Sequence, residues 1–259
     1  MQDFLQQLVV SNIFAFILIF VRFGVAMMIM PGIGDSFVSP QVRLLFAVAI
    51  SFVLTPVLSS HLPTLPPGSF ALLSMIVSEA FIGVFIGTVM RILVSALDTA
   101  GTLVSIQSSL SNSTMFNPTT EAQVPILSAV YSSLGVTLIF VTGMDHQMLA
   151  AVVDSYKLFP ATAGFPDTGS VSETIVKTLV LAFKVGVQLA VPFLVVGTLV
   201  QVGFGLLGRL MPQVQVFLIA LPLQILLSSI LLVFVLSAVM AAWLKEFEAA
   251  MVYFLSGGG

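Results

Sequence analysis

The 259-residue chain contains no cysteine and few charged side chains. Without cysteine it can form neither a disulfide nor a thiolate site for catalysis or metal binding. Charged residues make up 7% of the chain, against about 25% in soluble domains, and the mean hydropathy is +1.16. The sequence therefore predicts an integral membrane protein. The net charge of −3 provides no basic surface, which argues against nucleic acid as a partner.

The long apolar runs predict helices, because backbone amides in hydrocarbon must be bonded within their own segment and the alternation of a transmembrane β-barrel is missing. We expect an all-α polytopic membrane protein of about six long apolar helices, arranged as kinked hairpins in one domain spanning 1–259. The expected long helices are 4–30, 43–58, 70–97, 124–141, 172–208 and 212–254, with a short interfacial helix at 145–157. The acidic start and the long apolar run after it predict no cleaved signal peptide.

Among the charges inside the expected helices, we single out Glu79, Arg91 and Lys184. A charge at the bilayer centre costs at least about 2.5 kcal/mol, so these residues are candidates for function. They fit a secondary transporter that couples protons or a solute, or structural ion pairs with neighbouring subunits. The structural alternative is favoured, because no second acid or base lies at relay spacing.

Other local patterns predict packing. Met27, Met28 and Met30 are expected in the core at a helix end, and Trp243 is expected as an interfacial anchor. Glu173 and Lys177 have the i,i+4 spacing of a helical ion pair.

The segment 105–123 is a run of hydroxyl and amide side chains with one charge. Such a segment cannot face acyl chains. It is either an ordinary exposed loop or a segment that lines or blocks a water-filled cavity at membrane depth, and the residues alone favour neither alternative.

Motifs that resemble catalytic sites lack their required context. Residues 203–208 match the dinucleotide pattern GxGxxG, but no strand precedes them and no acidic residue follows at ribose distance, so helix packing is the better interpretation. Residues 32–35 match the GxGD of intramembrane aspartyl proteases without a second aspartate in a facing span. His61 and His146 are isolated. We therefore predict no enzyme, no cofactor and no metal site.

Two blocks resemble the FliR family of flagellar type III export-gate proteins. The first is 206–217, followed by 221–223, and its motif residues are Arg209, Pro212, Gln213, Phe217 and Pro222. The second covers 100–107, 110–111, 116–118 and 124–127. The family often has glycine where this chain has Ser105 and Ser109, and aspartate where it has Asn117.

The resemblance implies a channel subunit in the bacterial cytoplasmic (inner) membrane, within the flagellar basal body. Its implied partners are FliP and FliQ, with FlhA and FlhB nearby, together with unfolded export substrates and membrane lipids. Residues 1–125 would form a FliP-like half, and 126–259 would include a FliQ-like hairpin. The central loop would plug the pore through Gln107, Ser111, Met115, Phe116, Asn117 and Pro118. An injectisome relative remains an alternative, to be separated by genome neighbourhood.

Overall fold

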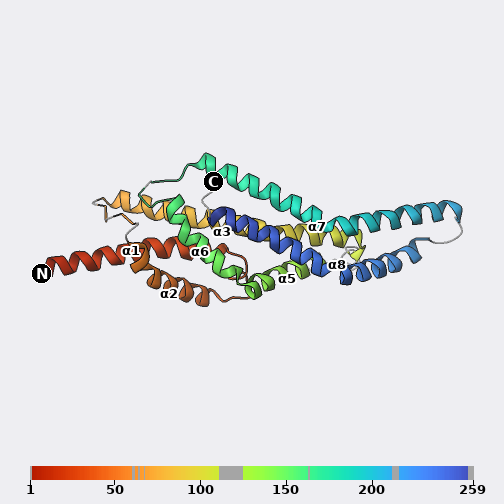
Figure 1. Cartoon of the computed structure of the whole chain (residues 1–259), viewed down its shortest axis with the longest axis horizontal. Coiled ribbons are helices and arrows are strands. Elements are labelled where there is room, and N and C mark those ends of the chain that lie inside the picture. The colour runs from red at the N-terminus through yellow and green to blue at the C-terminus, as the bar shows by residue number, and fades with distance from the viewer. Residues whose placement is uncertain are drawn as a thin grey trace. The chain divides into compact units, whose positions relative to one another are not determined.

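The computed structural model describes residues 2–59, 62–63, 65–66, 68–110, 125–162, 164–211 and 216–255. Within these ranges the chain forms α-helices and no strand (Figure 1). The helices are α1 (Gln2–Ile29), α2 (Pro40–Leu58), α3 (Ser69–Gln107), α5 (Ile126–Thr142), α6 (Met144–Leu158), α7 (Thr168–Leu210) and α8 (Val216–Leu255). Five are long and apolar enough to cross a membrane, and α5 with α6 would make a sixth bent span. The predicted all-α polytopic fold is confirmed.

The chain folds into two compact units. Unit 1 contains Met1–Ile92, Ile139–Thr178 and Ala249–Gly259, and unit 2 contains Leu93–Leu138 and Leu179–Glu248. Helices α3, α5, α7 and α8 therefore each contribute residues to both units. The predicted FliP-like and FliQ-like halves describe a family relationship, and that division stays a prediction.

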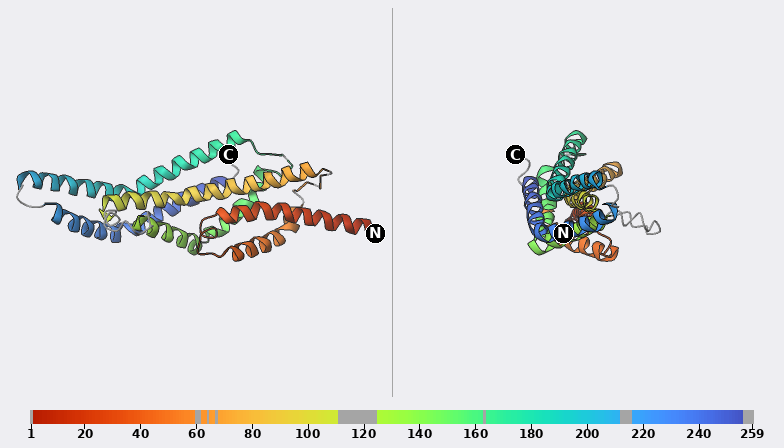
Figure 2. Two further views of the ribbon diagram at one scale, coloured as in Figure 1. Left: turned by 180° about the vertical axis from the view of Figure 1, so that it is seen from behind. Right: turned by 90° about the vertical axis from the view of Figure 1, so that its right-hand side faces the viewer.

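In unit 1, α1 lies antiparallel beside α2 (Figures 1 and 2) and packs tightly on α3. A Cβ atom on Gly83 would lie 2.5 Å from the carbonyl oxygen of Arg22, and one on Gly87 would lie 2.9 Å from that of Ala26. This GxxxG pair lets the two backbones approach closely. The apolar core beside it consists of Leu18, Ile19, Phe23, Met27, Met30, Val89 and Met90.

Local residues determine where the helices of unit 1 begin and bend. The Ser39 hydroxyl accepts a hydrogen bond from the Val42 amide at the start of α2. Asp167 accepts the amides of Gly169 and Ser170 at the start of α7, and these hydrogen bonds lower the pKa of its carboxyl group. Helices α5 and α6 meet at 78°, where Gly143 takes a left-handed conformation.

In unit 2, small residues bring α3 against α5 and α7. A Cβ atom on Gly101 would overlap the backbone of Ser128 in α5, and one on Gly186 in α7 would lie 2.8 Å from Cβ of Thr99. Gly101 lies six residues before the end of α3 and Ser128 lies near the start of α5. The end of α3 and the start of α5 are therefore close together in unit 2.

Helix α3 extends ten residues beyond its predicted end, to Gln107 and not Leu97. The prediction treated the polar residues as a break, but Leu97, Ala100 and Val104 continue a buried stripe at helical spacing. Ser105 and Gln107, expected in an irregular segment, are therefore helical.

Trp243 is buried in unit 2, so its predicted role as an interfacial anchor is wrong. Only 1% of the side chain is exposed, and its indole N–H donates to the Leu93 carbonyl over 3.3 Å. Gly135 lies beside the ring, and a Cβ at this position would overlap Cδ1 of Leu97 while only touching the indole at 3.5 Å.

Other packing predictions have mixed outcomes. Glu173 and Lys177 pair as predicted, with 2.8 Å between Oε1 and Nζ. Met27 and Met30 are buried as expected, whereas Met28 is half exposed. The glycines of 203–208 have no neighbour within 4 Å of their Cβ positions among the described residues, so they bring no two described helices together.

Candidate functional site

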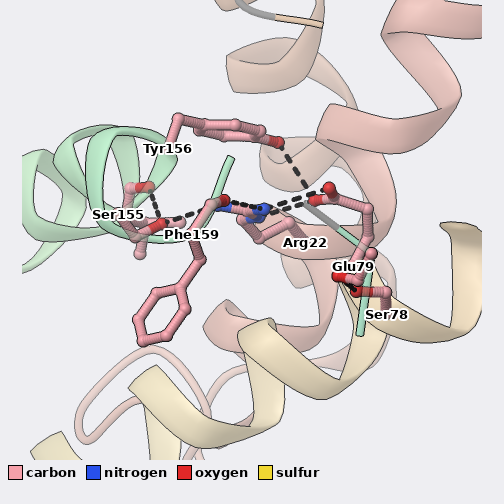
Figure 3. Close-up of polar contacts among 8 residues, drawn as sticks. Arg22, Ser78, Glu79, Ser155, Tyr156 and Phe159 are labelled. Carbon is pink, nitrogen blue, oxygen red and sulfur yellow. Dashed lines mark hydrogen bonds and ion pairs between the residues drawn. The ribbon is translucent and has the colours of Figure 1, made fainter. Parts of the chain in front are cut away.

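The most buried charges of unit 1 form one ion pair between α1 and α3. Arg22 Nε lies 2.5 Å from Glu79 Oε2, and Arg22 Nη2 lies 3.0 Å from Glu79 Oε1 (Figure 3). The two side chains are 0% and 2% exposed. This bidentate pair of hydrogen bonds is the strongest interaction that a guanidinium and a carboxylate can form.

The end of α6 completes the cluster (Figure 3). Arg22 donates over 3.0 Å to the Ser155 hydroxyl and over 3.0 Å to the Phe159 carbonyl. Its guanidinium carbon lies 3.7 Å from the centre of the Tyr156 ring, and the Tyr156 hydroxyl donates to Glu79 over 3.4 Å. Three helices are thus joined through one guanidinium, and both charges are compensated inside the chain.

The sequence identified Glu79 as an intramembrane charge but gave no partner for it. Arg22 is 57 residues away, beyond the reach of helical spacing. A signal was nevertheless present, because Arg22 is the only charge in 4–30 and Glu79 is the only charge between Arg43 and Arg91, with the opposite sign. Two lone opposite charges in apolar helices are natural partners.

Arg91 has a different role from Glu79. Its side chain is 52% exposed, and its Nη2 lies 3.0 Å from Asp35 Oδ1. Asp35 also accepts the Gly32 amide over 2.8 Å, while Arg43 donates to the carbonyls of Gly34 and Asp35. The aspartate of the protease-like motif thus organises the loop after α1.

Lys184 and Asp98 belong to unit 2. Lys184 is exposed on α7 and has no acidic partner among the described residues. Asp98 accepts hydroxyl hydrogen bonds from Ser128, over 3.2 Å, and from Ser132. The three charges therefore lie in different surroundings. Glu79 is in a buried ion pair, Arg91 contacts the loop after α1, and Lys184 lies on an exposed helix face.

The predicted loop residues lie at the end of α3 and beyond it. Gln107 is the last residue of α3, and its carbonyl accepts the side-chain amide of Gln224 over 2.5 Å. The other residues predicted for the plug lie outside the described residues: Ser111, Met115, Phe116, Asn117 and Pro118.

The motif residues of the C-terminal hairpin are described in part. Arg209 is exposed in the last turn of α7, and Pro222 lies inside α8. Pro212 and Gln213 lie outside the described residues, and Phe217 is described as part of α8 without its side chain. Among the described residues, no three His, Asp or Glu side chains group closely enough to hold a metal ion.

Comparison with known proteins places this arrangement in a family. Residues 13–250 match the model of a family described as bacterial export proteins, family 1. The chain belongs to this family. The match covers both units and every helix at least in part, and it confirms the resemblance drawn from the two sequence blocks.

Individual relatives carry export-related names. The flagellar biosynthetic protein FliR of Caulobacter vibrioides is 34% identical over 237 residues, covering 92% of this chain and 94% of the relative. FliR of Escherichia coli K12 is 29% identical, covering 75% and 74%. The Yop proteins translocation protein T of Yersinia pestis is 29% identical, covering 66% of each chain. With five membrane-spanning candidates, this export protein is a membrane component of a bacterial export apparatus.

Proposed function

We propose that the chain is a structural channel subunit of the flagellar type III export gate in the bacterial inner membrane. It assembles with FliP and FliQ around a pore for unfolded flagellar proteins, next to FlhA and FlhB. The observation that carries this proposal is the family match over 13–250, together with a FliR relative aligned over 94% of its length.

The uncovered helix faces support assembly with other subunits. Large apolar side chains are open on α2 and α8, with Phe52 73% exposed and Phe234 77% exposed. The α7 glycines Gly203, Gly205 and Gly208 have no neighbour near their Cβ positions in the described chain. Glycines on a membrane helix favour close approach of another helix, so this end of α7 fits a partner subunit better than lipid.

The segment between α3 and α5 is proposed as the plug of this pore. Its side chains are polar and mostly uncharged, and the end of α3 and the start of α5 lie close together in unit 2, where Gly101 meets Ser128. Such a segment blocks an aqueous path by filling it, and small hydroxyl side chains are displaced at little cost when a substrate arrives.

The proposed role is neither that of an enzyme nor that of a secondary transporter. The best-buried acid, Glu79, is closed off by two hydrogen bonds from Arg22, so it is not available as a proton relay in the manner of a secondary transporter. Purified chain alone in liposomes is therefore expected to transport neither protons nor solutes. Uptake by the chain alone that is abolished by Lys184→Met would favour the transporter.

Shortening residues 108–122 tests the plug. In cells that carry the complete export apparatus, the shortened chain is expected to raise ion leakage through the membrane, measured as potassium efflux. A matched control permutes Ser111, Asn112, Ser113 and Thr114 among themselves, which keeps length and polarity, and is expected to stay tight. Equal efflux from the shortened chain and the control would contradict the plug.

A further inference from the structure

The C-terminal end of α3 has an unusual set of partners. The last four carbonyl groups of a helix lack N–H donors within the helix and must accept hydrogen bonds from elsewhere. In α3 these carbonyls belong to Val104, Ser105, Ile106 and Gln107. Each of the four accepts a hydrogen bond, but the fourth donor comes from another helix.

Three of these hydrogen bonds are local. The Ser108 amide donates to Val104 over 2.8 Å, and the Ser109 amide donates to Ile106 over 3.2 Å. The Ser108 hydroxyl donates to the Ser105 carbonyl over 3.1 Å. Ser109 has φ of 62°, the left-handed conformation that usually ends a helix. The chain therefore turns away from the helix axis directly after Ser108.

The fourth hydrogen bond comes from α8. The side-chain amide of Gln224 donates to the Gln107 carbonyl over 2.5 Å. Gln224 is 6% exposed and is 117 residues from its acceptor. Losing this donor is expected to loosen the end of α3, because the Gln107 carbonyl then has to find another hydrogen-bond partner.

Helix α7 packs against the side chain of Gln107. A Cβ atom on Gly197 would overlap Cγ and Nε2 of Gln107. Only glycine at this position leaves room for the Gln107 side chain. Gln107 is thus held through its carbonyl by α8 and through its side chain by α7.

We infer that Gln224 is a positioning residue that fastens the end of α3 to the C-terminal hairpin α7–α8, with Gly197 as the seat for Gln107. The connection from α3 to α5 starts at this point. Its functional consequence rests on the proposed function: partner subunits that bind the hairpin also set where the pore-blocking segment begins.

The substitution Gln224→Met tests the inference, because methionine keeps the length of the side chain and removes the donor. Hydrogen exchange is measured on the full chain in detergent, over the amides of 104–110. Exchange there is expected to become about fivefold faster, the factor that one net hydrogen bond is worth. Gln188→Met is the matched control, since Gln188 is exposed on α7, and it is expected to leave exchange unchanged.

A second variant, Gly197→Ala, disturbs the seat without touching Gln224 and is expected to accelerate exchange over the same residues. The amides of 93–100 in α3 serve as an internal reference, so global unfolding is recognised by faster exchange there as well. If Gln224→Met unfolds the chain, the exchange of Gly197→Ala at 104–110 is used to test the inference in its place. Unchanged exchange at 104–110 in a folded variant overturns the inference.

Potassium efflux separates this inference from the proposed plug. Faster exchange combined with efflux between that of the wild type and that of the shortened 108–122 chain supports both. If Gln224→Met exchanges faster at 104–110 but neither it nor the shortened 108–122 chain leaks potassium, the attachment of α3 to α7–α8 is supported and the plug is contradicted. Efflux from the shortened chain, with normal exchange and no efflux in Gln224→Met, contradicts the fastening alone.

Discussion

At the scale of single residues, the Arg22–Glu79 pair defines the interior of unit 1. Two opposite charges are removed from water, and the guanidinium donates hydrogen bonds to a carboxylate, a hydroxyl and a carbonyl. A buried pair of this kind contributes little net stability compared with apolar residues, but an unpaired survivor is costly. The pair therefore specifies which helices meet more than it strengthens their contact.

Removing one partner is expected to destabilise the protein strongly. Arg22→Met leaves Glu79 buried without its cation, at a cost of about 3–5 kcal/mol. The double variant Arg22→Met with Glu79→Leu is expected to recover most of this loss. The measurement is thermal unfolding of the purified chain in detergent. Arg91→Met is the control, since its half-exposed pair with Asp35 is worth about 0–1 kcal/mol; equal losses in Arg22→Met and Arg91→Met would refute this account.

Ser109 provides a second prediction at this scale. A left-handed conformation costs a residue with a side chain about 1 kcal/mol, and glycine avoids that cost. Ser109→Gly is expected to unfold at or slightly above the wild-type temperature, whereas Ser109→Val is expected to unfold below it. A valine variant as stable as the glycine variant would mean that this turn is not left-handed in solution.

At the scale of helices, small residues decide which pairs can approach. Gly83 and Gly87 bring α3 to the backbone of α1, and Gly101 brings it to α5. The glycines near the end of α7 have no such neighbour in the described chain. The same residue type thus serves internal packing in α3 and, in the proposed function, external packing in α7.

This contrast predicts opposite effects of adding one methyl group. Gly83→Ala is expected to lower the unfolding temperature of the isolated chain, because the new Cβ would lie 2.5 Å from the Arg22 carbonyl oxygen. Gly205→Ala is expected to leave it unchanged or raise it, since alanine favours a helix by about 1 kcal/mol over glycine. A common direction for both variants would contradict the packing described for α3.

Helix existence could be predicted from the sequence, because apolar runs between charges and prolines are a strong signal. The end of α3 could not be predicted. Ser108 caps the helix with its own hydroxyl, but in the sequence a polar residue at this position resembles a helix break. The interfacial position predicted for Trp243 is wrong because an aromatic residue beside charges resembles a membrane anchor, and only the packed helices show its burial and its hydrogen bond to Leu93.

The candidate site was predictable where spacing is local. Glu173 and Lys177 are one helical turn apart, so their pairing follows from helix geometry. The hydrogen bonds from Arg22 to Glu79 and from Gln224 to Gln107 join residues 57 and 117 positions apart. Periodicity carries no information on such pairs, and only the packing of complete helices brings them together.

At the scale of the whole molecule, the long helices are the organising feature. Helices α3, α7 and α8 each contribute to both compact units, and each is longer than about 20 residues, the length that a bilayer requires. Their open faces carry large apolar side chains, among them Leu199 at 67% exposed and Val233 at 79% exposed. Surfaces of this kind are suited to assembly inside a membrane complex.

Affinity purification of the tagged full-length chain from its own cells tests the central claim most directly. The account predicts that FliP and FliQ are recovered with the chain in a constant ratio, and that deletion of its gene abolishes motility. Recovery of the chain alone, from cells that remain motile after the deletion, would contradict the assignment to the export gate.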